Sequence, residues 1–86
     1  MRHARDADLD RVEPLLVQLR ALPGIVEQKR GVFYFKSRAF LHFHEDPKGI
    51  FADIREAGSG GFDRIDVTEA AGRATLLEAA RQRLGV

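Results

Sequence analysis

Two histidines separated by a single residue, His42 and His44, are the side chains of this sequence best suited to chemistry. They lie in residues 40–44, an apolar run typical of a β-strand, in which alternate residues point to the same side. Asp53 lies in the next strand-like run, residues 50–55. Two imidazoles and a carboxylate can bind a first-row metal, most often zinc, and leave a coordination position for water. His42, His44 and Asp53 are therefore our candidate metal ligands, and Zn²⁺ is the candidate cofactor.

The hairpin between these two runs allows two registers. Asp46-Pro47-Lys48-Gly49 is typical of a type I turn closed by a glycine bulge. In its three-residue form this turn places Asp46 opposite Ile50 and puts His42 on the same face as Ile54. The alternation of apolar and polar residues instead places His42 beside Asp53. Because a shift of one residue reverses the face of every side chain, only one register can hold. We favour the alternation, since burying two histidines costs more than an unusual turn.

Alternation along the strands also predicts which face of the sheet is open. One set of alternating residues is almost entirely apolar, and we assign it to the face that the helices cover. The other set mixes aromatic rings, charged groups and both histidines, and we expect it to form an open binding face. Besides the three metal candidates, the residues predicted on this open face are Tyr34, Phe40, Phe51, Arg55, Phe62, Arg64 and Asp66.

Apolar residues at helical spacing predict a helix before the strands and another after them. Residues 8–22 show a helical stripe of apolar side chains, with Asp10 and Glu13 at the spacing of a capping box. Residues 68–84 show a second stripe, and Thr68 is placed to cap that helix. Residues 1–7 have no such pattern, so we expect them to be flexible and expect His3 to play no part in a metal site.

The order of these elements predicts an α+β two-layer sandwich. We expect one domain over residues 1–86, in the order helix, four antiparallel strands and helix, with both helices on one face of a sheet that spans residues 25–67. Residues 25–36 form either one bent strand or two paired strands. We favour two strands, with the first at residues 25–29.

Composition narrows the classes of function. The chain has no cysteine, so it has no thiolate ligand or cysteine nucleophile, and we expect it in the cytoplasm. No apolar run is long enough for a signal peptide or a membrane span. The net charge of +1 is too small to favour a nucleic-acid partner, although aromatic residues and two arginines on an open sheet also suit single strands.

The nature of the open face favours binding over catalysis. Asp53 can orient His42 as a general base, but the sequence places no serine where such a base would activate it. Exposed aromatic residues such as Phe51 and Phe62 favour self-association. We therefore expect a non-enzymatic binding or assembly domain, a homodimer, with a small ligand or a protein as its partner. Metal binding and single-stranded nucleic-acid binding are the alternatives.

The central strands also resemble a known family. Residues 31–35, the His42-Phe43-His44 strand and the Asp53 strand are similar to the small proteins labelled luciferase-domain. The resemblance covers residues 31–55 and does not imply light emission, because a chain of 86 residues has no room for a flavin-binding barrel. The helix–sheet–helix order is also similar to YjbR-like domains, often labelled DNA-binding. Neither resemblance implies a substrate.

Overall fold

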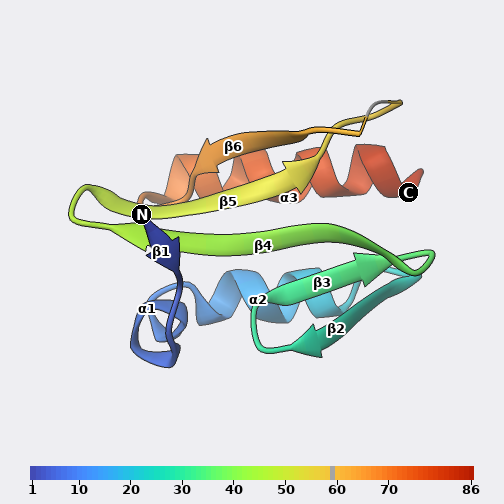
Figure 1. Cartoon of the computed structure of the whole chain (residues 1–86). Coiled ribbons are helices and arrows are strands. Elements are labelled where there is room, and N and C mark those ends of the chain that lie inside the picture. Colours follow the sequence, from blue (N-terminus) through green and yellow to red (C-terminus); the bar gives the residue numbers. More distant parts are fainter. Residues whose placement is uncertain (59) are drawn as a thin grey trace.

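Five strands from the middle of the chain form an antiparallel sheet in the order β2-β3-β4-β5-β6, so each strand pairs with its neighbour in sequence (Figure 1). The computed structural model describes residues 1–58 and 60–86. Short turns connect successive strands, which is why no crossover interrupts the order. The strands are β2 (Ile25–Lys29), β3 (Val32–Phe35), β4 (Arg38–Asp46), β5 (Gly49–Arg55) and β6 (Phe62–Asp66).

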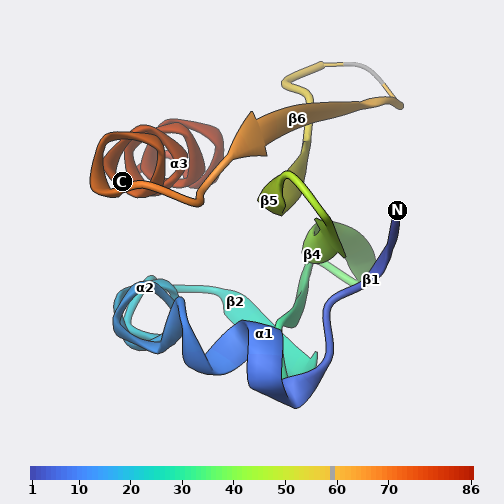
Figure 2. The ribbon, with the colours of Figure 1, turned by 90° about the vertical axis from the view of Figure 1, so that its left-hand side faces the viewer.

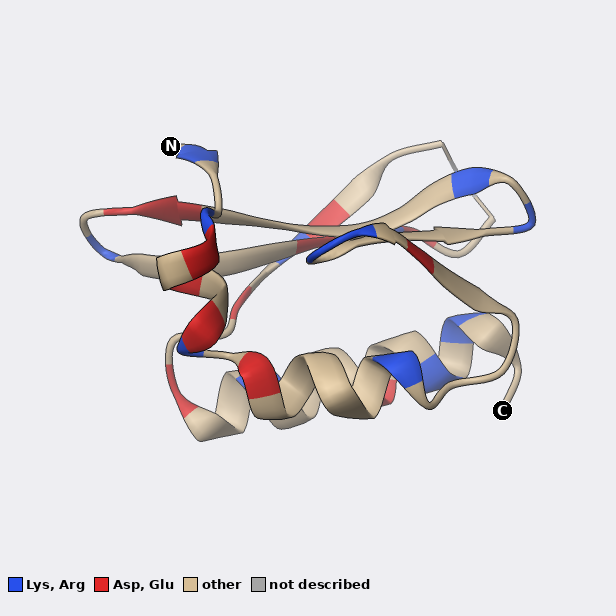
Figure 3. Cartoon of the chain, turned by 90° about the horizontal axis from the view of Figure 1, so that it is seen from below, with Lys and Arg blue, Asp and Glu red and all other residues tan. Residues whose placement is uncertain are grey.

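The two long helices cover one face of this sheet, as Figures 2 and 3 show. These are α2 (Glu13–Arg20) and α3 (Ala70–Leu84), and they pack side by side as a second layer. The predicted α+β two-layer sandwich is thereby confirmed, and the separate first strand at Ile25–Lys29 is confirmed with it. The number of strands was wrong: β2 to β6 make five instead of four, because residues 25–36 form two paired strands. Between the layers lies a core of buried apolar side chains. Those with essentially no exposed surface include Leu16, Leu19, Phe33, Leu41, Ile54, Val67 and Leu76.

The N-terminal residues differ from the flexible segment that we expected. Residues Arg2–His3 form a short strand, β1, which pairs antiparallel with β4 and places Arg2 opposite Glu45. The Arg2 guanidinium is 2.8 Å from the Glu45 carboxylate. Strand β4 has nine residues whereas β3 has four, so β4 extends past the end of β3. Strand β1 pairs with this free edge of β4. A strand of two residues is too short to show a pattern in the sequence, so it could not be predicted.

The first helical segment is broken in two. In place of one helix over residues 8–22, the chain forms α1 (Asp6–Asp10) and then α2, whose N-cap is Val12 rather than Asp10. Pro14 lies in the first turn of α2, and in one continuous helix its ring would clash with the backbone carbonyl of Asp10, to which it also has no N–H to donate. Asp10 forms an ion pair with Arg30 at 2.8 Å instead of capping the helix.

The N-terminus of α3 also differs from the prediction. Glu69 is the N-cap residue, and Thr68 turns toward the sheet, where its hydroxyl accepts a hydrogen bond from the Ile50 backbone N–H at 3.0 Å. Thr68 therefore joins the end of β6 to the start of β5. This bond satisfies the buried backbone N–H of Ile50. If the Thr68 hydroxyl capped α3 instead, that N–H would lose its partner.

Phe40 is a correction to the predicted open face. Phe33 pairs with Leu41 and Tyr34 pairs with Ala39, so a bulge leaves Phe40 without a partner residue in β3. The bulge reverses the alternation, as an extra residue in one strand must. Phe40 is only 4% exposed and belongs to the core, where its ring lies 5.9 Å from that of Phe35.

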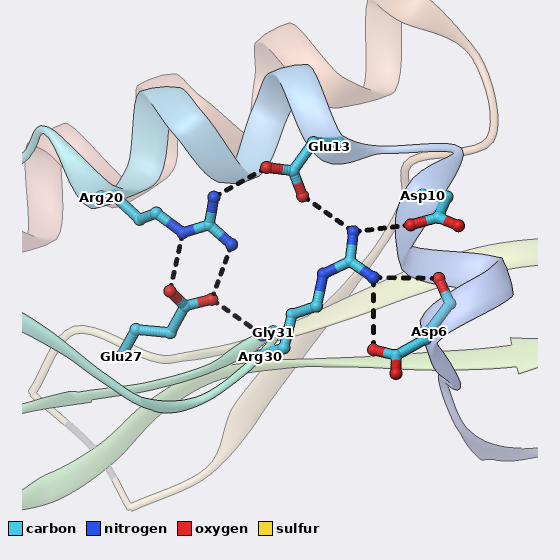
Figure 4. Close-up of polar contacts among 7 residues, drawn as sticks. All are labelled: Asp6, Asp10, Glu13, Arg20, Glu27, Arg30 and Gly31. Atoms are coloured by element: carbon cyan, nitrogen blue, oxygen red, sulfur yellow. Dashed lines mark hydrogen bonds and ion pairs between the residues drawn. The ribbon is translucent and has the colours of Figure 1, made fainter.

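A network of ion pairs joins α1 and α2 to the turn between β2 and β3 (Figure 4). Arg30 in this turn contacts Glu13 at 2.9 Å, and Arg20 contacts both Glu13 and Glu27. Hydrogen bonds from Arg20 are the main cause that lowers the pKa of Glu27. The network holds the first helical segment at the edge of the sheet next to β1. Its members are Asp6, Asp10, Glu13, Arg20, Glu27, Arg30 and Gly31.

Candidate metal centre

Four neighbouring strands bring the polar residues of the open face into one cluster. His42 in β4 lies opposite Asp53 in β5, and Asp53 lies opposite Arg64 in β6, which makes a row across three strands. His44 lies two residues along β4 on the same face, and His3 in β1 lies opposite His44. Directly opposed residues in antiparallel strands have neighbouring side chains. The register of the sheet is therefore what assembles the cluster.

The register that places His42 beside Asp53 is confirmed, and the three-residue turn is wrong. Asp46 pairs with Gly49, so the loop contains only Pro47 and Lys48. The Asp46 side chain accepts a hydrogen bond from the Lys48 backbone N–H at 2.8 Å, which closes the loop locally. The alternation of side chains along the whole hairpin outweighs the preference of the turn residues.

The distances in the cluster are those of a metal ligand set. The Asp53 Oδ2 atom lies 3.2 Å from His44 Nε2 and 3.6 Å from His42 Nε2. One ligand atom from each of the three residues lies within 4.8 Å of the others. Two ligands held about 2.1 Å from a zinc ion in tetrahedral geometry are about 3.4 Å apart. The two distances from Asp53 Oδ2, 3.2 Å and 3.6 Å, lie on either side of this spacing.

The protonation states also suit metal binding. Burial lowers the pKa of His42 and of His44, so both rings are neutral at pH 7 and keep a nitrogen lone pair. Hydrogen bonds from Arg64 lower the pKa of Asp53, so the carboxylate is ionised although the residue is only 9% exposed. Two neutral imidazoles and one carboxylate are the forms that bind a divalent cation.

Arg64 holds the carboxylate in place with two hydrogen bonds. Its Nε donates to Asp53 Oδ1 at 2.8 Å, and its NH2 group donates to Asp53 Oδ2 at 2.9 Å. The Arg64 side chain is half exposed, so it can turn toward solvent without disturbing the core. Its contact with Oδ1 orients the ligand, as partners of metal-binding carboxylates do. Its contact with Oδ2 competes with a cation for the same oxygen.

Aromatic rings surround the two histidines. The ring of His3 stacks on that of His44 with centroids 4.8 Å apart, and the ring of Phe62 meets His42 edge-on at 5.2 Å. His42 and His44 are themselves 4.9 Å apart. Sequence reasoning missed His3, since its proximity depends on the pairing of β1. The only signal in the sequence is that His3 is the third of three histidines.

Two of the predicted open-face residues make structural contacts. The Arg55 Nε donates to the Ala39 carbonyl at 2.6 Å, and the guanidinium lies over the Phe62 ring. Asp66 accepts a hydrogen bond from the Thr68 backbone N–H at 2.9 Å. The bonds to Thr68 lower the pKa of Asp66, which ends β6 as part of a turn. Neither side chain belongs to the histidine cluster.

The aromatic residues predicted on the open face differ in position and in burial. Phe51 is half-buried and lies opposite His44 on one side and Asp66 on the other. Phe62 is 37% exposed. Tyr34 lines a cavity beside β1, and Phe40 lies in the core. The open face therefore has fewer adjacent aromatic rings than the alternation predicted.

Comparisons of the chain with protein-family models, curated proteins and solved structures give no match. The resemblances to the luciferase-domain family and to YjbR-like domains therefore stay predictions. In the part of the chain that the structure describes, none of the helices is long and apolar enough to span a membrane.

Proposed function

We propose that this chain is a small binding domain whose open sheet face holds one divalent first-row cation, with zinc as the preferred ion. The observation that carries the proposal is the convergence of His42, His44 and Asp53 from two strands. The two imidazole nitrogens lie 3.6 and 3.2 Å from one carboxylate oxygen. Borderline-soft imidazole together with one carboxylate suits zinc better than magnesium or calcium, which prefer oxygen ligands.

The chemistry of the cluster supports a site with an open position. Three protein ligands leave one tetrahedral position for water or another ligand, as in catalytic rather than structural zinc sites. We expect a binding role in which this open position takes up a ligand. A histidine cluster that only forms hydrogen bonds is the competing explanation, and a metal titration separates the two.

The test is a calorimetric titration of the metal-free protein with zinc. We expect one ion per chain and a higher melting temperature, which corresponds to about 2.7 kcal/mol at a free zinc concentration a hundred times the dissociation constant. His42→Ala should lose the binding. Asp53→Asn should weaken it strongly, because the charge is lost while the shape is kept.

Asp63→Asn is the matched control for that variant. Asp63 is one strand away in β6, where it pairs with Arg83 at 3.0 Å and does not contact the histidines. We expect this variant to bind zinc like the parent protein. Zinc heats no larger than dilution, or equal binding by the Asp53 and Asp63 variants, would refute the proposal.

Self-association is a further part of the proposal and rests on a different observation. Phe62 is exposed and its ring contacts His42, and the half-buried Phe51 lies on the other side of the Asp53–Arg64 pair. A second copy that packs face to face can cover both rings. Sedimentation equilibrium should then give a dimer at micromolar concentration, and Phe62→Ser should shift it to monomer. A parent protein that sediments as a monomer across this range would exclude the dimer.

The proposal also includes a cytoplasmic location and a partner other than nucleic acid. The absence of cysteine supports a reducing compartment such as the cytoplasm. Single-stranded nucleic acid is not favoured, since Arg55 and Arg64 are both engaged in contacts within the domain. These contacts leave less positive charge to attract a phosphate backbone.

A further inference from the structure

A cavity of about 510 Å³ lies directly beside the histidine cluster. It occupies the gap between β1 and β3, which both pair with the same edge of β4. Its volume falls within the range of about 300–1,000 Å³ that is typical of small-molecule sites. His3 and His42 belong both to its wall and to the cluster. A molecule in the cavity is therefore next to the position where a metal ion would bind.

More of the surface of the cavity wall is apolar than polar, and six of the lining residues have polar or charged side chains. Apolar residues of α1, β3 and β4 form part of this wall, of which Leu9 and Phe43 are each only 3% exposed. This composition fits a ligand with a hydrocarbon body and only one or two polar ends. The apolar lining residues are Ala4, Leu9, Val32, Ala39 and Phe43.

The charges at the metal side of the cavity favour an anionic end on that ligand. Arg30, which lines the cavity, is shared by three carboxylates, those of Asp6 at 3.2 Å, Asp10 at 2.8 Å and Glu13 at 2.9 Å. Negative charge is therefore in excess around Arg30, and an anionic end of the ligand would lie at the metal side of the cavity. Lys29 also lines the cavity, and it forms no ion pair with any residue that the structure describes. On the metal side, the positive charge of a divalent ion and of Arg64 together is larger than the single negative charge of Asp53. Both sources of charge attract an anion and repel a cation.

We propose that the cavity binds a small organic carboxylate with an apolar body, whose carboxylate takes the open coordination position of the metal ion. This inference rests on the proposed metal site. The hydrocarbon part fills the space between β1 and β3, and Lys29 attracts the carboxylate. Binding is coordination without any covalent step, and water leaves the open position when the carboxylate enters.

The protein contains its own reporter for this binding. Tyr34 is the single tyrosine, there is no tryptophan, and Tyr34 lines the cavity, so intrinsic fluorescence reports on that site alone. The zinc-loaded protein is titrated with hexanoate, with acetate and with 1-hexanol. Each buried methylene strengthens binding roughly fourfold, so four additional methylenes should make hexanoate bind roughly 250-fold more tightly than acetate. Hexanol lacks the carboxylate and should bind more weakly than hexanoate.

Two variants test where the hydrocarbon part lies. Ala39→Leu adds a larger side chain to the cavity wall and should remove the advantage of hexanoate over acetate while zinc affinity is retained. Ala74→Leu is the matched control, since Ala74 is exposed on α3 and does not line the cavity. Lys29→Gln on the rim provides an independent test that leaves the packed wall intact. It should weaken hexanoate severalfold and leave hexanol unchanged.

The outcomes separate this inference from the proposed metal site. In the cobalt-loaded protein, hexanoate should shift the visible absorption of the metal, because a carboxylate replaces water in its coordination sphere. If the protein binds zinc but prefers hexanoate no more than acetate, or if Ala39→Leu and Lys29→Gln both bind hexanoate like the parent, the carboxylate site is refuted and the metal site stands. Failure of zinc to bind refutes the metal site itself.

Discussion

His3 and His44 face one another across the β1–β4 pair, and their rings stack with centroids 4.8 Å apart and an interplanar angle of 30°. The N-terminal strand thus brings the third histidine of the chain to the two that share a strand. Its ring covers one side of His44 and lies 6.0 Å from the ring of His42. A residue that the sequence separates from the cluster by nearly forty positions thereby becomes part of its wall.

We predict that His3→Ala weakens zinc binding without abolishing it. Loss of the stacked ring removes an aromatic contact worth about 0.5–1.5 kcal/mol, which corresponds to roughly two- to twelvefold in affinity if the contact orients His44 for the metal. The measurement is a zinc titration of the variant beside the parent protein, with His44→Ala as the comparison that should lose binding. This replaces the sequence-based expectation that His3 has no influence, and unchanged affinity would restore that expectation.

Arg64→Gln should have opposite effects on the metal-free and metal-bound forms. Without the guanidinium, the nearly buried carboxylate of Asp53 loses two hydrogen bonds, so the metal-free protein should melt at a lower temperature. The same change removes a positive charge that competes for Asp53 Oδ2, so zinc affinity should rise about tenfold. Thermal melting with and without zinc measures both effects. A fall in affinity would mean that Arg64 is needed mainly to orient the ligand.

The stability of the metal-free protein should begin to decrease when the pH falls below about 6.5. Burial lowers the pKa of His42 and of His44 in the folded state, so below the ordinary histidine pKa the unfolded chain binds more protons than the folded one. The loss continues until the pH passes the folded pKa values and then levels off. Asp53 contributes in the same direction only at lower pH, because its pKa is lowered and its stabilising effect is lost as the pH falls through the folded value.

Thermal melting between pH 8 and pH 5 measures this dependence. In the double variant His42→Gln/His44→Gln the melting temperature should change less over the same interval, since neither glutamine titrates. An equally steep dependence in parent and double variant would show that other groups control it.

Gly72→Ala should destabilise the fold even though alanine is the better helix former. Gly72 lies in the first turn of α3, and a Cβ atom there would overlap the backbone carbonyl oxygen of Asp66. Relieving this overlap must move α3 away from β6, and overpacking of this kind costs about 1–3 kcal/mol. Gly60→Ala is the control, since a Cβ atom at Gly60 meets nothing within 4 Å and should change stability little. Equal stabilities in urea denaturation would contradict the prediction.

Sequence periodicity was sufficient for the architecture and for the core of the site. Helical stripes at both ends and alternation between them predict the two-layer sandwich. The pairing of His42 with Asp53 also follows from alternation, because burial of one face decides the register more strongly than four turn residues do. Whether the three candidate ligands bind a metal ion is a separate prediction, which the titration tests.

Tertiary structure alone decided three other features. The place of Phe40 depends on a bulge that reverses the alternation within one strand, and such a bulge arises from how β3 and β4 pair. Thr68 bonds to Ile50 instead of capping α3, because β5 presents a buried donor at that point. The position of His3 depends on the part of β4 that β3 leaves unpaired. Local patterns in a sequence show which residues face solvent and which face the core. Contacts between distant segments depend instead on which strand edges and backbone N–H donors remain unpaired after the rest of the chain has folded.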